Sequence, residues 1–531
     1  MLLSRIINPH TKSIRFLCSL NTTAEPSHLP PPEEEDEEKI AAEITTICKS
    51  FPNNLNWKTL NQNLKFINFN NSNLINKVLI QLKDPPNAKK ALSFFHWSSH
   101  FTNIAHQTHT YALIIHILVN AKLVKDASAL IESVLARSVA GNDSSVISFI
   151  DCLISSYDVT NSSTFVFDLL IQICSKLRMI DEAVEGCFCL GKHGFRSSVI
   201  SYNTLLYVIQ KSDRTFLVWK VYEHMIVHRT YPNEKSVGIM VNALCKDGKL
   251  QTFVDMVDRI DGKRCLPRVI VNTCLIFRMI EDGRIEDGLV LMKRMLIKNM
   301  ILDTISYSLI VYGRIKLGEL ESAWEVYEEM VKRGFKVNSF VHTSFIRAYC
   351  EVGKIKDGDE LFKDMERVGL QVYDETYTHL IVGCAKIGRL EESLNFCEKM
   401  VQSGFVPSCL AFNGVVKRLN GHGNVLRANE LLTLLLDKGF VPDVNTYSYL
   451  IAGYGKEGDV EGVVKLYYEM EYRKLSPGAL VFTWLIVSLH QVGKFEESDR
   501  FLRIMKARSL VSSDCTMDML IHCHNKHRET I

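Results

Sequence analysis

Apolar residues recur with the period of an α-helix through most of the chain, and the whole pattern repeats every 35 residues. In residues 304–338, TISYSLIVYGRIKLGELESAWEVYEEMVKRGFKVN, the apolar positions from Leu320 to Met330 are spaced 3, 4 and 3, which places them on one helix face. A matching apolar face begins at Tyr307, and Gly318 separates the two stretches. Each repeat therefore predicts a pair of helices that meet at a glycine.

Three sets of positions keep this register. Glycine recurs at eight successive places 35 residues apart, at Gly248, Gly283, Gly318, Gly353, Gly388, Gly423, Gly458 and Gly493. A late position of the second predicted helix holds Met225, Met295, Met330, Met365, Met400, Met470 and Met505, with Ile260 and Leu435 at the intervening places. An aromatic position near the start holds Phe167, Tyr202, Tyr307, Tyr377, Phe412, Tyr447 and Phe482. If a repeat begins three residues before this aromatic, ten full repeats run over residues 164–513 without an insertion.

One such helix pair cannot cover its own apolar faces, so neighbouring repeats must stack, and the sequence predicts an all-α solenoid. Upstream, residues 73–142 fit two degenerate repeats, and residues 41–72 are expected to form an N-terminal helical cap. Residues 143–163 interrupt the register and are either an enlarged loop or a degenerate helix. A half-repeat over residues 514–531 is expected to cap the other end.

Residues 1–24 are basic, contain Ser and Thr but no acid, and carry apolar residues at helical intervals. Arg5, Lys12 and Arg15 break the continuous apolar run that a secretory signal needs, so the segment is typical of an organellar transit peptide. A disordered tail is the alternative. The arginines favour the mitochondrion, with the chloroplast as the second choice. Residues 25–40, rich in proline and then in acids, are expected to form a linker.

Composition limits the remaining possibilities. At 531 residues the chain exceeds the roughly 250–300 residues of a single core. The net charge is only +2, and residues 39–531 carry +6, because residues 1–38 contribute −4 to the total. The small net charge therefore gives no electrostatic indication of a polyanionic partner. The 15 cysteines are scattered and odd in number, which favours reduced thiols in an intracellular compartment, and no apolar run is long enough to predict a membrane span.

The repeat has Tyr or Phe near its start, Gly before the second helix, Met late in that helix, and then Pro-Asp or Pro-Asn. It resembles the pentatricopeptide repeat family, of the plain-repeat (P-type) subclass of plant organelles; TYSYLIAGYGKEGDVEGVVKLYYEM is a representative stretch. The resemblance covers about residues 73–531, and the period argues against the 34-residue tetratricopeptide repeat. It implies a right-handed superhelix of helix-turn-helix repeats that binds single-stranded organellar RNA. In that family each repeat reads one base with its fifth and last residues, and its apolar second residue stacks on the base.

Carried onto this chain, the resemblance implies four readable pairs: Asn203 with Asn233 for a pyrimidine, Thr273 with Asp303 for guanine, Ser308 with Asn338 for adenine, and Asn413 with Asp443 for uracil. Weaker candidates, whose partners depart from the common pairs, are Thr343, Thr378, Ser448 and Thr483. The stacking candidates are Ile200, Ile270, Ile305, Phe340, Leu410 and Leu480. Short polar residues in these places are also common as helix caps, which is the alternative role for each of them.

No catalytic motif accompanies the repeats. A deaminase needs His-x-Glu and Cys-x-x-Cys, neither of which follows residue 479, and a nuclease needs clustered aspartates in a separate domain. His522, Cys523, His524 and His527 are too crowded for a closed four-ligand site. We therefore expect no enzyme activity, metal, cofactor or small-molecule substrate.

Two functions remain open. The sequence favours an RNA-binding protein that acts on transcript processing, stability, splicing or translation by occupying its site. The alternative is a helical scaffold that holds a protein partner in a mitochondrial complex, which the modest positive charge of residues 39–531 also permits.

Overall fold

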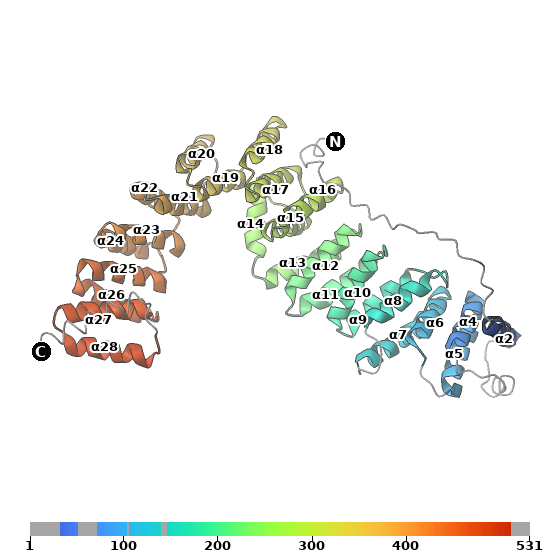
Figure 1. Ribbon diagram of the computed structural model, residues 1–531. Helices are drawn as coiled ribbons and strands as arrows, with labels where there is room; N and C mark the ends of the chain where they lie inside the picture. The colour runs from blue at the N-terminus through green and yellow to red at the C-terminus, as the bar shows by residue number, and fades with distance from the viewer. Residues whose placement is uncertain (1–31, 51–71, 103–105, 140–145, 511–531) are drawn as a thin grey trace. The chain divides into compact units, whose positions relative to one another are not determined.

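The computed structural model describes residues 32–50, 72–102, 106–139 and 146–510. Every regular element in these ranges is a helix (Figure 1). By their internal contacts the residues form two compact units, which we describe separately: residues 1–255 with 265–302, and residues 256–264 with 303–531. The expected transit peptide and C-terminal half-repeat, including the His522 to His527 cluster, lie outside the described residues.

The helices of the first unit are α2 (Pro32–Ser50), α4 (Ser72–Gln81), the 3₁₀ turn η1 (Pro85–Asn87), α5 (Ala88–Thr102), α6 (Thr108–Asn120), α7 (Val124–Val139), α8 (Val146–Tyr157), α9 (Phe165–Lys176), α10 (Ile180–Lys192), α11 (Val199–Lys211), α12 (Thr215–Val227), α13 (Glu234–Lys246), α15 (Pro267–Glu281) and α16 (Ile285–Ile297). Helix α14 (Leu250–Asp261) begins in the first unit and ends in the second.

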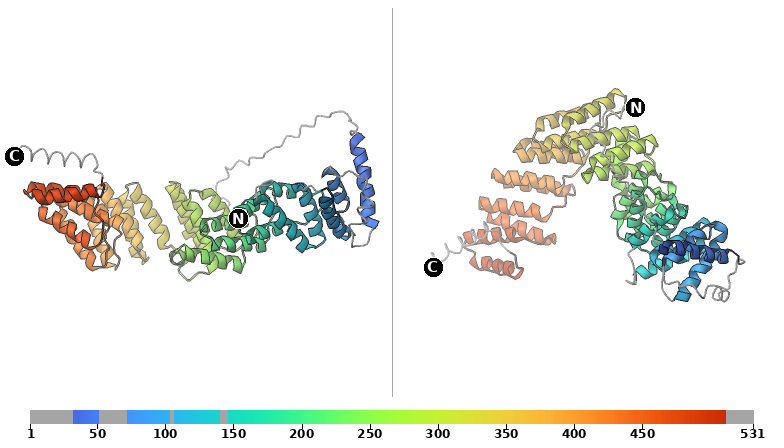
Figure 2. Two further views of the ribbon diagram at one scale, coloured as in Figure 1. Left: turned by 90° about the horizontal axis from the view of Figure 1, so that it is seen from below. Right: turned by 45° about the vertical axis from the view of Figure 1, so that its right-hand side comes forward.

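The second unit continues with α17 (Asp303–Lys316), α18 (Leu320–Lys332), α19 (Ser339–Glu351), α20 (Ile355–Val368), α21 (Asp374–Ile387), α22 (Leu390–Gln402), α23 (Cys409–Gly421), α24 (Val425–Asp437), α25 (Val444–Glu457), α26 (Val460–Tyr472), α27 (Ala479–Gln491) and α28 (Phe495–Ala507). Two helices per repeat, packed against the helices of neighbouring repeats, confirm the predicted all-α stack of helix pairs (Figure 2).

Two stretches outside the ten regular repeats are helical as well. Helix α8 lies in the interruption at residues 143–163 and packs on α6 and α10. Helix α2 starts at Pro32 and thus includes much of the stretch expected to be a linker.

The glycine at the end of each first helix has a left-handed backbone. All eight glycines of the 35-residue series have φ between 66° and 86°. Residues with a Cβ adopt this conformation at a cost, whereas glycine does not. In the repeats that begin at 108 and 164 the same place holds Lys122 and Arg178, with φ of 60° and 59°. The turn is therefore the same in all of these repeats, and only its side chain varies.

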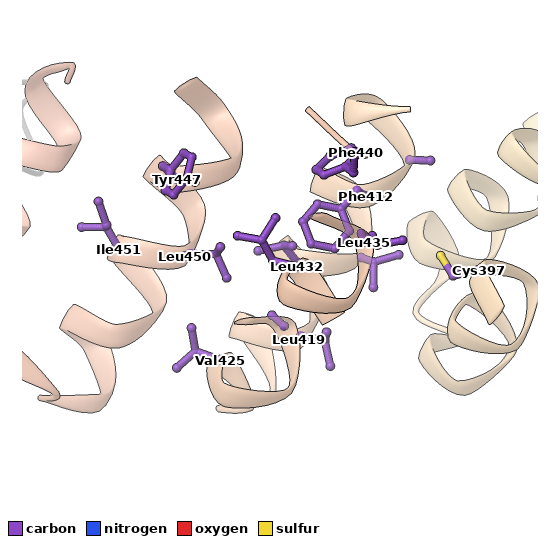
Figure 3. Packing of buried hydrophobic residues seen from close by; sticks show 14 of the residues in the cluster. Cys397, Phe412, Leu419, Val425, Leu432, Leu435, Phe440, Tyr447, Leu450 and Ile451 are labelled. Atoms are coloured by element: carbon purple, nitrogen blue, oxygen red, sulfur yellow. The ribbon is translucent and has the colours of Figure 1, made fainter. Parts of the chain in front are cut away.

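The methionine and aromatic series form the core. In the second unit Phe412 is fully buried, and its ring centre lies 5.1 Å from that of Phe440, which follows the second helix of the same repeat. Leu435, in the methionine place, and Leu432 lie against the same rings (Figure 3). Because each such side chain stabilises the fold by roughly 1.5–3 kcal/mol when buried, the repeats hold one another by a continuous apolar seam.

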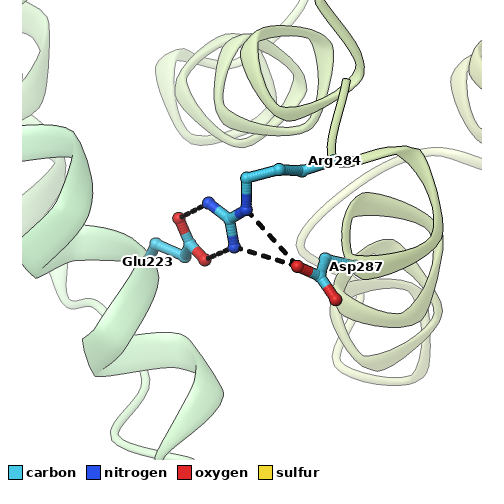
Figure 4. Close-up of polar contacts among 3 residues, drawn as sticks. All are labelled: Glu223, Arg284 and Asp287. Carbon is cyan, nitrogen blue, oxygen red and sulfur yellow. Dashed lines mark hydrogen bonds and ion pairs between the residues drawn. The ribbon is translucent and has the colours of Figure 1, made fainter. Parts of the chain in front are cut away.

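Helix α14 departs from the regular stack. Second helices of successive repeats are normally neighbours, as where Arg427 of α24 pairs with Glu391 of α22 at 3.0 Å. In the first unit, however, α12 contacts α16 directly across a skipped repeat: Arg284 donates two hydrogen bonds to Glu223, of 2.6 and 2.9 Å, and also pairs with Asp287 (Figure 4). Helix α14 therefore does not stand between α12 and α16, although its sequence keeps the repeat register.

Candidate nucleic-acid interface

The last residue of several repeats caps the first helix of the next. The side chains of Ser198, Asn233, Asn338, Ser408 and Asp443 each accept a hydrogen bond from the backbone N–H three residues later. Such a cap stabilises a helix by about 1 kcal/mol. The capping role considered from the sequence is thus present at three of the four last-position candidates, Asn233, Asn338 and Asp443.

The structure also brings the paired candidates together. Asn203 Nδ2 donates to Asn233 Oδ1 at 3.1 Å, and Asn338 Nδ2 donates to Ser308 Oγ at 3.0 Å. The third pair has the same geometry, with Asn413 Nδ2 at 3.1 Å from Asp443 Oδ1. Residues 30 positions apart therefore form polar pairs at the junctions between repeats. The fourth pair, Thr273 and Asp303, has one member in each compact unit.

Solvent reaches these pairs unequally. Asn233 is exposed, and Asn413 and Asp443 are half-buried. Ser308 is fully buried and Asn338 is 5% exposed, so the pair assigned to adenine is covered in this conformation. Thr273 is fully buried as well, and its hydroxyl has no hydrogen-bond partner among the described residues.

The stacking candidates divide in the same way. Ile200, Leu410 and Leu480 expose 68%, 71% and 36% of their surface, so a base could lie against each. Ile270 and Ile305 are buried, at 6% and 0%. Phe340 is half-buried, with its ring centre 5.4 Å from that of Tyr312. As the structure stands, Ile270 and Ile305 cannot receive a base, because the resemblance assigns a position in the repeat but not its surroundings.

The weaker candidates mostly serve their own helices. Ser448 and Thr483 donate to the carbonyl oxygens of Val444 and Ala479, one turn back. Thr343 shares a hydrogen bond of 2.7 Å with Thr376 of the next repeat. Thr378 is half-buried.

The best-formed candidate site is a groove of about 740 Å³ on the first helices α21, α23 and α25 of the second unit. Leu410 and Asn413 line it beside Lys386, Lys417 and Tyr449. The ammonium group of Lys417 lies 5.9 Å from the ring centre of Tyr449. The sequence analysis did not identify either lysine. Lys417 could have been predicted, because it follows Leu410 by seven residues and therefore lies on the same helix face.

Asp443 is held as a carboxylate in this groove's polar pair. Burial alone would raise its pKa, but hydrogen bonds from the Thr446 backbone N–H at 2.7 Å, from Asn413 and from the Thr446 hydroxyl hold the pKa below its usual value. An ionised carboxylate only accepts hydrogen bonds. It suits a base that offers an N–H on its pairing edge.

No group of three or more His, Cys, Asp and Glu side chains within the described residues is placed to hold a metal ion. None of the described helices is both long enough and apolar enough to cross a bilayer.

These features define a helical-repeat protein with a polar pair at the junctions between its repeats. Models of the PPR repeat family match residues 302–351, of the PPR repeat residues 340–370 and 445–475, and of the pentatricopeptide repeat domain residues 360–421. Residues 302–421 and 445–475 therefore consist of repeats of the pentatricopeptide repeat family.

Among its relatives is a mitochondrial pentatricopeptide repeat-containing protein of Arabidopsis thaliana, 47% identical over 220 residues, which are 41% of this chain and 39% of that protein. A second Arabidopsis pentatricopeptide repeat-containing protein is 29% identical over 32% of this chain and 22% of its own length. The chain thus spans well under two thirds of these relatives. The crystal structure of pentatricopeptide repeat protein PPR10 from maize is 16% identical, with a TM-score of 0.36 over 89% of this chain and 78% of that one.

Proposed function

We propose that the chain is a sequence-specific single-stranded RNA-binding protein of the mitochondrion. One observation carries the proposal: the exposed Leu410, the exposed cations Lys386 and Lys417, and Asn413 line one groove, and Asn413 is hydrogen-bonded to Asp443. The mitochondrial relative supports the compartment. Binding would act by occupancy, on the processing, stability, splicing or translation of a transcript.

The groove offers what one nucleotide of a single strand requires. A base can stack on Leu410, which other stacking surfaces suggest is worth about 1 kcal/mol or more. The pairing edge of uracil presents an N–H between two carbonyl oxygens, so the Asp443 carboxylate can accept the N–H while an amide N–H of Asn413 donates to a carbonyl. Lys386 and Lys417 carry the charge that a neighbouring phosphate needs.

One base per repeat gives an ordered target. From the repeat at 199 onward, the pairs predict pyrimidine, an unassigned base, G, A, purine, purine, U, purine, purine. Crosslinking the tagged protein to RNA in purified mitochondria and sequencing the bound fragments would test this. We expect one dominant footprint with G-A followed by U three nucleotides after the A, and the absence of any enriched RNA would contradict the proposal.

A single substitution tests the groove itself. We expect Asp443→Asn to move the preference at the seventh position from uracil toward cytosine, because an amide can donate to the cytosine ring nitrogen where a carboxylate can only accept. Asparagine caps a helix as well as aspartate does, so folding should be preserved. A binding selection on randomised RNA measures the preference.

Asp459→Asn is the matched control for that selection. Asp459 is also a helix cap, accepting from the N–H of Gly462, but it starts the second helix α26, whereas Asp443 starts the first helix α25 and pairs with Asn413. It should leave the seventh base unchanged. If both variants keep uracil, the pair Asn413–Asp443 does not read a base.

A protein scaffold is the second candidate. Tyr468 and Tyr472, one turn apart on α26, expose 56% and 88% of their surface. Aromatic residues of this kind are common at protein interfaces. Co-purification of a protein from mitochondria without enriched RNA would make this the better function.

A further inference from the structure

Four cations gather in the first unit where the ends of α10, α12 and α16 meet. Arg196, Arg229, Arg294 and Lys298 line a cavity of about 440 Å³ together with Tyr231 and Ile297. Three of these cations are exposed and Arg294 is half-buried. The Lys298 ammonium lies 5.2 Å from the ring centre of Tyr231.

The cavity exists because α12 and α16 are direct neighbours. The two hydrogen bonds from Arg284 to Glu223 fix one end of α16 against α12, and Arg294 donates to the carbonyl oxygen of Val227 at 3.0 Å near the other end. The loops after two repeats that are not consecutive are thereby brought to one place. A regular stack would have separated them by the intervening second helix.

The charge of this cavity is not neutralised. Carboxylates are absent from its lining, and among the described residues none forms an ion pair with Arg196, Arg229, Arg294 or Lys298. Other arginines of the stack, such as Arg284 and Arg333, do have carboxylate partners within hydrogen-bond distance. Four like charges in one cavity repel one another, and an anion placed among them relieves the repulsion.

The cavity adjoins the row of base-reading positions. Arg196 and Tyr231 each stand two residues before the last residue of a repeat, Ser198 and Asn233 respectively. The side chain of Asn233 is exposed, and that of Ile200, at the start of the same repeat, is 68% exposed. A strand whose base reached this repeat would therefore carry its phosphate backbone past the cavity.

We infer that this cavity binds a phosphodiester group of the RNA strand, beside the repeat from 199, an inference that rests on the proposed RNA-binding function. Guanidinium groups match the paired oxygens of a phosphate, and Tyr231 and Ile297 offer apolar surface to the adjoining ribose. The contact is independent of sequence. It anchors the strand in the first unit, while the bases are read elsewhere.

Arg229→Gly is a test that spares the fold. Arg229 has a left-handed backbone, with φ of 60°, which glycine adopts without strain, so the substitution removes the cation alone. Lys474→Gly is the matched control: it occupies the same place in the repeat from 444, has φ of 58°, loses the same charge and lies outside the cavity. Both variants are compared in the full chain.

The measurement is the affinity for a single-stranded RNA that carries the expected target, over a range of salt concentrations. For Arg229→Gly we expect affinity about fivefold lower at moderate salt and a smaller slope of log affinity against log salt, by about 0.7 for one lost phosphate contact. The loss should be equal for RNAs that differ in the base at the repeat from 199.

Lys474→Gly should match the unaltered chain. Equal slopes in the cavity variant and in Lys474→Gly, with RNA binding intact, would overturn the cavity assignment and leave the proposed function standing. A loss that depends on the base would also overturn it, since a phosphate contact reads no base. Failure of the unaltered chain to bind RNA would overturn the proposed function and this inference together.

Discussion

At the scale of single residues, the turn between the two helices of a repeat has one backbone conformation and several side chains. Eight repeats place glycine there, with nothing within 4 Å of the position a Cβ would take at Gly248, Gly318 and Gly458. Glycine is thus required by the backbone and not by crowding. Lys122 and Arg178 adopt the same left-handed conformation with a Cβ.

Because some turns hold glycine and others a residue with a Cβ, substitutions at this position should change the stability of the fold. We expect Arg178→Gly to raise the free energy of unfolding by about 0.5–1 kcal/mol, because relief of the left-handed strain exceeds the extra freedom that glycine gives the unfolded chain. Gly318→Ala should change it by about 1 kcal/mol in the opposite direction. Urea unfolding followed by circular dichroism measures both, and a less stable Arg178→Gly variant would contradict the explanation.

Only some of these residue-level features could be predicted from the sequence. The turn glycines could be, because they recur at a strict spacing of 35 residues. The hydrogen bonds within Asn203–Asn233 and Asn413–Asp443 agree with the paired positions that the family resemblance supplies. The burial of Ile305 could not be predicted from the sequence. Ile305 occupies the same position in its repeat as the exposed Leu410, and only its surroundings differ.

At the scale of elements, α14 is the exception to an otherwise regular chain. The repeat that contains it keeps Gly248 and Ile260 in register, so its sequence predicts an ordinary second helix. In the first unit Phe253 of α14 lies instead against Phe277 of the first helix α15, with ring centres 5.9 Å apart. Periodicity fixes which residues are apolar, but not which neighbour they cover.

Phe277 lies on the same face of α15 as two of the residues proposed to contact a base. It follows Ile270 and Thr273 at spacings of seven and four, so the three share one side of α15. Both of these candidates are buried, at 6% and 0%. The contact from Phe253 therefore helps to cover the residues of this repeat that we propose read guanine.

We expect Phe253→Ala to uncover this face. The variant should gain discrimination for guanine at the third position of the target, by about threefold or more, because the base gains access to Thr273 and to Ile270 as a stacking surface. The affinity for RNAs that differ only at this base measures the effect. Phe216→Ala is the control, since Phe216 is 58% exposed on the second helix α12; equal discrimination in both variants would refute the idea.

At the scale of the whole molecule, both units contain imidazoles that are neutral because they are buried. Burial lowers the pKa of His116 to about 4, against the effect of its hydrogen bond to the Leu153 carbonyl oxygen. Burial also lowers the pKa of His224 and of His379 to about 4, aided in the first by His228 and in the second by Arg347. Each of these groups binds a proton more readily in the unfolded chain.

Stability should therefore fall with acidification. Above the unfolded pKa of 6.5 both states hold these histidines neutral, and as pH drops from 6.5 toward about 4 the unfolded chain takes up protons that the folded chain excludes. We expect His116→Gln, which can keep the donor to α8, to remove on the order of 2 kcal/mol of that loss. Urea unfolding at several pH values tests it, and parallel profiles of variant and unaltered chain would count against it.

The capping side chains at the repeat junctions carry a consequence for how such a protein changes over generations. Ser, Asn and Asp start a helix about equally well, and the same three residues offer different donors and acceptors to a nucleotide. A lineage can thus exchange Asn233 or Asp443 for another member of the set one step at a time, with every intermediate still folded. Under the proposed function, the RNA sequence that the protein recognises can therefore change through single substitutions that leave its folding intact.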